Sequence, residues 1–64
     1  MVKINGEMCS ADGRSIAEML ADMGYSEKRV AVEINEQIVP KADYSSTFLK
    51  DGDSVEVVRF VGGG

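Results

Sequence analysis

The residues with the clearest chemical potential in this sequence are the last three, Gly62-Gly63-Gly64. A C-terminal carboxylate has a pKa of about 3.5, so at neutral pH it is ionised and is a poor electrophile. It becomes reactive only when a partner converts it into a mixed anhydride such as an acyl-adenylate. We therefore expect Gly64 to be the site at which another protein does chemistry. The alternative is that the three glycines are an inert, frayed end.

Glycine suits a terminus that must pass through a narrow channel. Because it has no Cβ, Gly62 and Gly63 would need only the narrowest channel in an extended conformation, whereas any side chain would widen it. Ordering each residue costs about 1–2 kcal/mol of backbone entropy, and binding of the folded domain must offset that cost. An apolar docking surface is therefore expected close to the glycines.

The rest of the chain offers little catalytic chemistry. It contains no histidine, the commonest general base, and one cysteine, Cys9, which cannot form an internal disulfide or a multi-cysteine metal site. Met19 and Met23 fit the apolar stripe of a helix and are interpreted as core side chains. No nucleophile–base constellation is recognisable. The sequence thus predicts a protein that is not an enzyme and that binds no metal or cofactor itself.

Length and charge limit the class of protein and its partners. A chain of 64 residues makes one domain, and such a domain buries only about 60% of its unfolded surface. The net charge of −4 argues against nucleic acid and permits attraction to a basic partner. No apolar run approaches the ~20 residues that cross a bilayer, and no signal-peptide pattern is present. We expect a cytoplasmic protein.

The first ten residues predict a β-hairpin. Val2–Ile4 and Glu7–Ser10 flank Asn5-Gly6, the strongest two-residue hairpin signal. In that register Val2 and Cys9 share one face, so Cys9 is expected to be a small, half-buried hydrophobe.

A helix is predicted to follow the hairpin. Ser15 and Glu18 have the spacing of a capping box, in which each side chain accepts a hydrogen bond from the backbone of the other. Gly24 is the expected left-handed end of the helix. One apolar stripe is formed by Ile16, Met19, Leu20 and Met23.

The second half predicts strands. The expected elements are strands Val30–Ile34 and Gln37–Val39 around a turn at Asn35-Glu36, an end to the second strand at Pro40, an irregular segment over residues 41–49, a turn over residues 50–53, and a last strand over Ser54–Val61. Glu36 is unusual for a type I′ turn. Tyr44 and Phe48 are expected to close the end of the core. The order favours an α+β two-layer domain over residues 1–61, with 62–64 as a glycine tail.

The last strand has two apolar faces. Val55 and Val57 share one side, whereas Glu56, Val58 and Phe60 share the other. If the helix covers the first side, Val58 and Phe60 point away from it, beside the glycines. We interpret this second side as a docking surface, with Glu56 available to a basic partner. The alternative is that Phe60 folds back onto neighbouring side chains.

These segments resemble the ThiS family of ubiquitin-like sulfur carriers over the whole chain. The resemblance lies in VKINGE, SIAEMLADMG, VAVEINEQIVPKADYSSTFLKDGDSVEVVRF and the final VGGG. It implies a β-grasp fold with one helix on a small mixed sheet. The sequence departs from the family at Glu36, where glycine is usual, and this concerns the turn geometry.

The resemblance also implies a reaction cycle. A ThiF-like adenylating enzyme would use ATP to adenylate the Gly64 carboxylate. Sulfur from a cysteine desulfurase would convert the adenylate into a thiocarboxylate, and a ThiG-like thiazole synthase would take up the sulfur in thiamin biosynthesis. The partners would bind Glu56, Val58 and Phe60 together with the segment Val61-Gly62-Gly63.

Two other functions remain open from the sequence. A carrier for molybdopterin synthesis or another pathway would have a similar fold and tail. A non-covalent ubiquitin-like interaction module would leave its tail unused.

Overall fold

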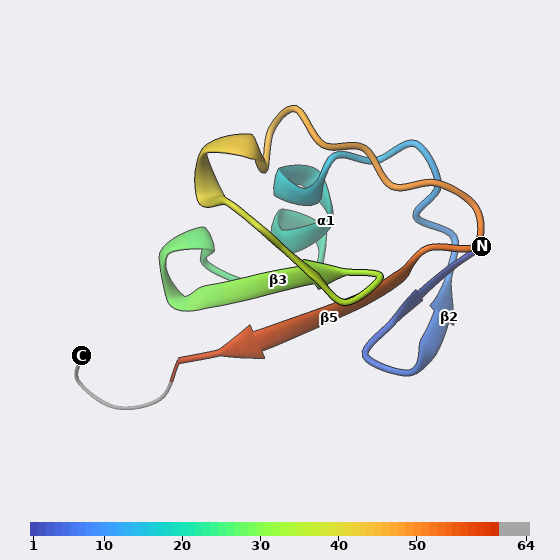
Figure 1. Ribbon diagram of the computed structural model, residues 1–64, viewed down its shortest axis with the longest axis horizontal. Coiled ribbons are helices and arrows are strands. Elements are labelled where there is room, and N and C mark those ends of the chain that lie inside the picture. The colour runs from blue at the N-terminus through green and yellow to red at the C-terminus, as the bar shows by residue number, and fades with distance from the viewer. Residues whose placement is uncertain (61–64) are drawn as a thin grey trace.

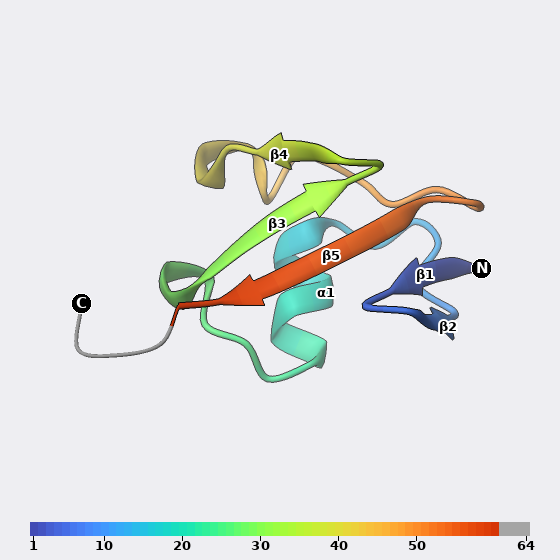
Figure 2. The same cartoon turned by 60° about the horizontal axis from the view of Figure 1, so that its bottom comes forward.

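The computed structural model describes residues 1–60, which form a five-stranded sheet with one α-helix against one face (Figures 1 and 2). The elements are β1 (Val2–Ile4), β2 (Glu7–Cys9), α1 (Ile16–Asp22), the 3₁₀ helix η1 (Glu27–Arg29), β3 (Val30–Ile34), β4 (Gln37–Val39), the 3₁₀ helix η2 (Lys41–Asp43) and β5 (Ser54–Arg59). The strand order is β2-β1-β5-β3-β4. Because β1 and β5 are parallel and the other neighbours antiparallel, this is the expected β-grasp arrangement.

β5 lies at the centre of the sheet, and two asparagines hold it there. The Asn5 side chain, from the β1–β2 turn, accepts a hydrogen bond from the Val57 N–H at 2.8 Å. The Asn35 side chain, from the β3–β4 turn, accepts one from the Ser54 N–H at 3.0 Å. Both hairpins are therefore tied to the central strand through their turns. These two contacts were not predicted from the sequence.

The helix begins as predicted. The Ser15 Oγ accepts a hydrogen bond from the Glu18 N–H at 3.0 Å, and the Glu18 carboxylate accepts one from the Ser15 N–H at 2.9 Å. Gly24 follows the helix with a φ of +80°, as expected of a left-handed stop. The prediction for Met23 is wrong, because the helix is only seven residues long and Met23 is its C-cap. Its side chain is 43% exposed.

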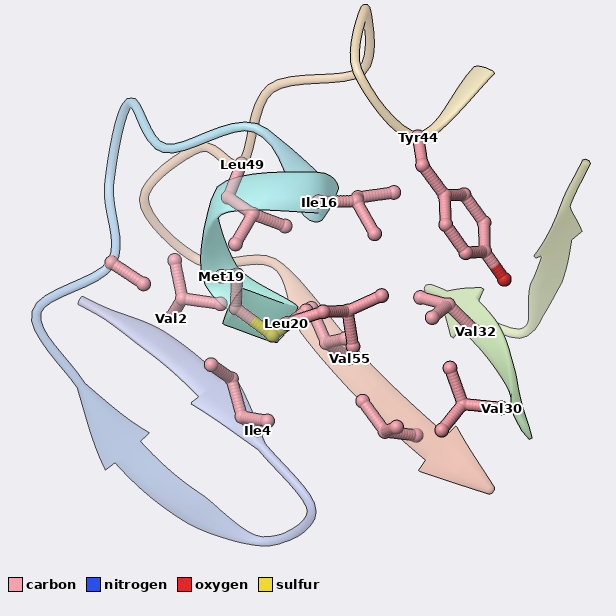
Figure 3. Close-up of a cluster of buried hydrophobic side chains, with 12 residues drawn as sticks. Val2, Ile4, Ile16, Met19, Leu20, Val30, Val32, Tyr44, Leu49 and Val55 are labelled. Carbon is pink, nitrogen blue, oxygen red and sulfur yellow. The ribbon is translucent and has the colours of Figure 1, made fainter. Parts of the chain in front are cut away.

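The core lies between α1 and the sheet (Figure 3). Its members come from every strand except β2 and β4, from α1 and from the segments before α1 and after β4; they are Val2, Ile4, Ala11, Ile16, Met19, Leu20, Val30, Val32, Tyr44, Leu49, Val55 and Val57. Cys9 packs against this core and is half-buried, as expected. Tyr44 is buried as predicted, but Phe48 is exposed. In an extended segment alternate side chains point to opposite sides, and Leu49 takes the inward position.

The β3–β4 turn places Glu36 in a strained conformation. Asn35 and Glu36 have φ values of +51° and +69°, as a type I′ turn requires. A left-handed conformation costs an L-residue roughly 1–2 kcal/mol, and glycine avoids this cost. With glutamate in place of the glycine of the family pattern, the turn still has the positive φ values of type I′, but it is less stable.

Replacing Glu36 with glycine is expected to stabilise the domain. The relief of strain exceeds the extra flexibility that glycine brings to the unfolded chain, so the free energy of unfolding should rise by about 0.5–1 kcal/mol. Urea denaturation measures this change. Glu36→Ala is the matched control, because it removes the carboxylate but keeps the Cβ. If the glycine and alanine variants had equal free energies of unfolding, the claim that the left-handed conformation of Glu36 is strained would be wrong.

Burial of Tyr44 predicts a specific alkaline response. The side chain is 1% exposed, and its burial raises the pKa of the phenol, while a hydrogen bond donated by the Val32 backbone to the phenol oxygen opposes the shift. An unfolded tyrosine ionises at about pH 10. Above that pH the unfolded state therefore loses the proton that the native state retains, and the free energy of unfolding falls as the pH rises.

Two variants test this response. Tyr25→Phe leaves Tyr44 as the single tyrosine, and its absorbance titration should have a midpoint above about 10. Tyr44→Phe should lose less stability than the wild type between neutral and strongly alkaline pH in urea denaturation. A tyrosine midpoint at or below the ordinary value would contradict the burial effect.

The last strand is shorter than predicted. The described strand ends at Arg59, although the Phe60 N–H still donates to the Arg29 carbonyl at 2.8 Å. Val61 and the glycines 62–64 lie outside the described residues. The boundary between domain and tail therefore stays a prediction.

Candidate functional site

The candidate site lies on the sheet face opposite α1. Figure 2 shows β5 passing in front of the helix, which lies behind the sheet. Val55 and Val57 point toward the helix and are 3% and 7% exposed, whereas Val58 and Phe60 are 46% and 58% exposed. The predicted division into two faces is confirmed for Val55, Val57 and Val58, which lie in β5, and Phe60, just after the strand, is exposed as expected. Of the described residues, none folds over Phe60 enough to bury it.

Neighbouring strands extend this surface. In the antiparallel pairing of β3 with β5, Ala31 lies opposite Val58 and Glu33 lies opposite Glu56. On the next strand Ile38 lies opposite Glu33 and is 73% exposed. Directly paired residues share one side of a sheet. We define the open face as Ala31, Glu33, Ile38, Glu56, Val58 and Phe60.

The open face combines apolar and acidic chemistry. Ala31, Val58 and Phe60 lie toward the end of β5, and the carboxylates of Glu33 and Glu56 lie beside them. Like charges placed directly opposite each other on a sheet are unfavourable. Within residues 1–60, neither carboxylate takes part in an ion pair. A basic group on a partner would therefore relieve this repulsion.

The sequence pointed to only half of the open face. Glu56, Val58 and Phe60 were predicted from their alternation along one strand. Ala31, Glu33 and Ile38 were missed, because their position depends on the register between strands. The available signal was the alternation along the strand Val30–Ile34, since the strand period places Ala31 and Glu33 on the side opposite Val30 and Val32, which are buried.

The chain reaches the glycines directly from this face. β5 points away from the N-terminal end of the molecule in both views (Figures 1 and 2). Phe60 is the last described residue, and its backbone is held by the Arg29 carbonyl. The predicted site residues Val61, Gly62, Gly63 and Gly64 follow it and lie outside the described residues. The apolar surface and the predicted reactive end are thus adjacent in the chain.

The described residues hold no cluster suited to a metal ion. In the part of the chain from Met1 to Phe60, no group of three or more His, Cys, Asp or Glu side chains could ligate a metal. Within the same residues, no helix is both long enough and apolar enough to span a membrane. What this surface offers is binding through apolar contact and charge.

Comparison with known proteins identifies the family. The family model described as "ThiS family" matches residues 1–64, the whole chain. The chain belongs to the ThiS family. It is 41% identical over 64 residues to the sulfur carrier protein ThiS of Thermus thermophilus, and the match covers 100% of both chains.

Two further comparisons place the chain among its relatives. The crystal structure of the thiamine biosynthesis protein ThiS from Geobacter metallireducens superimposes with a TM-score of 0.78 at 30% identity, covering 98% of this chain and 97% of that one. The thiazole synthase of Paramagnetospirillum magneticum is 42% identical over 62 residues, which are 95% of this chain. This chain spans only 19% of that larger protein.

Proposed function

We propose that this protein is a sulfur carrier of thiamin biosynthesis whose Gly64 carboxylate becomes a thiocarboxylate. The observation that carries the proposal is the open face, which ends at Phe60, directly before Val61 and the three glycines. Family membership over residues 1–64 supports it. In this proposal the carrier is a co-substrate and not an enzyme.

The reaction begins with activation by a ThiF-like adenylating enzyme. A carboxylate oxygen of Gly64 attacks the α-phosphorus of ATP, and pyrophosphate leaves. ATP is bound by that enzyme, because the carrier needs only to present its terminus. The acyl-adenylate carbon is then a good electrophile, unlike the ionised carboxylate before it.

Sulfur transfer follows activation. The terminal sulfur of a persulfide, formed by a cysteine desulfurase, attacks the acyl carbon of Gly64, and AMP leaves. A thiol then attacks the inner sulfur of the resulting acyl disulfide, which releases the thiocarboxylate and leaves a new disulfide between the thiol and the former persulfide sulfur. The thiocarboxylate stays deprotonated at neutral pH and presents a strongly nucleophilic sulfur. A ThiG-like thiazole synthase then accepts the sulfur.

The thiazole synthase partner is supported by one of the comparisons. A protein named thiazole synthase contains a segment 42% identical to this chain, within a polypeptide about five times as long. Two functions joined in one polypeptide commonly act together. We therefore infer that this carrier donates its sulfur to a thiazole synthase.

The open face provides the binding energy in this proposal. Apolar burial of Val58 and Phe60 offsets the entropy lost when the glycines are ordered in a partner's active site, at about 1–2 kcal/mol per residue. Glu33 and Glu56 favour a partner with basic groups beside an apolar patch. The same surface can serve the adenylating enzyme and the thiazole synthase in turn.

Intact mass spectrometry tests the proposed reaction. The protein is incubated with ATP, a ThiF-like enzyme, a cysteine desulfurase and cysteine. A mass gain equal to the exchange of one oxygen for one sulfur is expected, and omission of ATP is the control that prevents it. No gain with an adenylating enzyme that modifies its own carrier would favour a non-covalent interaction module instead.

A further inference from the structure

Lys41 connects three segments of the chain beside the end of β5. It is the first residue of η2 and follows Pro40 at the end of β4. Its ammonium donates hydrogen bonds to the Glu27 carbonyl at 2.6 Å and to the Val30 carbonyl at 2.5 Å. These carbonyls lie on η1 and at the start of β3. The ammonium therefore has a fixed position, held by backbone atoms on either side of Arg29.

The same ammonium lies near two aromatic rings. Lys41 Nζ is 5.7 Å from the ring centroid of Tyr44 and 5.7 Å from that of Phe60. A cation within about 6 Å of an aromatic face is attracted to it. Tyr44 is buried in the core, whereas Phe60 is 58% exposed and belongs to the open face. Of the two rings, only that of Phe60 needs this contact to be held in place.

The backbone of Phe60 is held by the same segment. Its N–H donates to the Arg29 carbonyl at 2.8 Å, and Arg29 lies between the two residues whose carbonyls bind Lys41. Lys41 thus stabilises the segment that holds the Phe60 backbone and also attracts the Phe60 ring. This pair of contacts acts on the last described residue before the chain continues toward Gly62–Gly64.

We propose that Lys41 is a positioning residue that fixes Phe60 and thereby directs the glycines toward a partner's active site. The inference rests on the proposed function, because it assigns Lys41 a part in presenting Gly64. When Phe60 is fixed, the carrier populates fewer conformations at this point of the chain, and a larger fraction of them is ready to bind the partner. Loss of the ammonium should therefore weaken productive binding and leave the chemical steps unchanged.

Lys41→Met is the main test, because methionine keeps an unbranched apolar side chain and removes the charge and its donors. Hydrogen exchange of the Phe60 amide should become about fivefold faster, while exchange at the Val57 amide should not change. With the ThiF-like enzyme, KM for the carrier should rise about fivefold at unchanged kcat. Lys41→Arg keeps a cation and its hydrogen-bond donors. In this variant the exchange rate of the Phe60 amide and the KM for the carrier should both stay close to the wild-type values.

The matched control is Lys28→Met on η1. Lys28 is exposed, and among the described residues its ammonium makes no hydrogen bond or ion pair. This variant should behave as the wild type in both measurements. If Lys41→Met does not fold, Lys41→Gln replaces it, because the amide can still donate to a carbonyl while the charge is lost.

The outcomes separate this inference from the proposed function. Unchanged exchange at Phe60 in the Lys41 variant would overturn the inference, and so would faster exchange with an unchanged KM. If the wild-type carrier is not adenylated by an active enzyme, the proposed function fails. In that case hydrogen exchange would still decide whether Lys41 fixes Phe60. The proposed role of Lys41 in presenting Gly64 would be overturned, because there would be no adenylation for it to assist.

Discussion

Deletion of Gly64 is expected to abolish thiocarboxylate formation while leaving the folded domain intact. The deletion moves the terminal carboxylate back by one residue, which is up to about 3.5 Å in an extended chain. Misplacing a reacting group by about 1 Å can already reduce a rate by roughly 100-fold. We therefore expect the rate of adenylation to fall by at least about 1,000-fold. Intact mass spectrometry and pyrophosphate release measure the loss.

The shortened protein should still bind its partners. The open face is formed by residues 31–60 and does not include Gly64. The deletion variant should therefore compete with the wild type for the adenylating enzyme. A second variant with two alanines added after Gly64 should also fail, because its glycine no longer carries the terminal carboxylate. Sulfur incorporation into either variant would mean that the reactive group lies elsewhere, or that the added residues are removed before the reaction.

Local signals in the sequence predicted most of the described fold. Asn5-Gly6 located the first hairpin, and its register pairs Val2 with Cys9 as expected. The Ser15–Glu18 capping box located the start of α1. Such features depend on residues within a few positions of one another, so the physics that decides them is present in a short window.

Side chains at the limits of elements were harder to predict. Met23 fits the apolar stripe but lies beyond the last turn of α1, because the length of the helix depends on where the chain must turn back to the sheet. Phe48 is large and apolar, yet Leu49 takes the place in the core. The choice between neighbours is made by packing against α1 and the sheet, which a linear pattern does not encode.

Contacts between distant segments were not predictable at all. Lys41 and Phe60 are far apart in sequence, and their approach depends on η1 and β3 lying between them. The pairing of Glu33 with Glu56 depends on the same register of β3 against β5. The sequence therefore predicted a docking strand, and the structure extends it to a surface that includes residues of the two neighbouring strands, β3 and β4.

Phe60→Ala is expected to weaken binding to the adenylating enzyme by about tenfold to thirtyfold. Truncation of a large aromatic side chain at the centre of an interface commonly costs about 2 kcal/mol of binding free energy. Phe60 is 58% exposed in the free carrier, so the substitution removes little packing from the domain itself. Titration calorimetry measures the dissociation constant, and thermal unfolding checks the fold.

The second phenylalanine provides the matched control. Phe48 is 55% exposed, almost as much as Phe60, but its backbone pairs with Ser15 at the start of α1, away from the open face. Phe48→Ala should leave the dissociation constant unchanged. The comparison separates the position of an exposed aromatic side chain from its mere presence, since both variants lose the same ring. An equal loss of affinity in the two variants would remove the open face from the binding site, and a loss in Phe48→Ala alone would place the partner on the helical side of the domain.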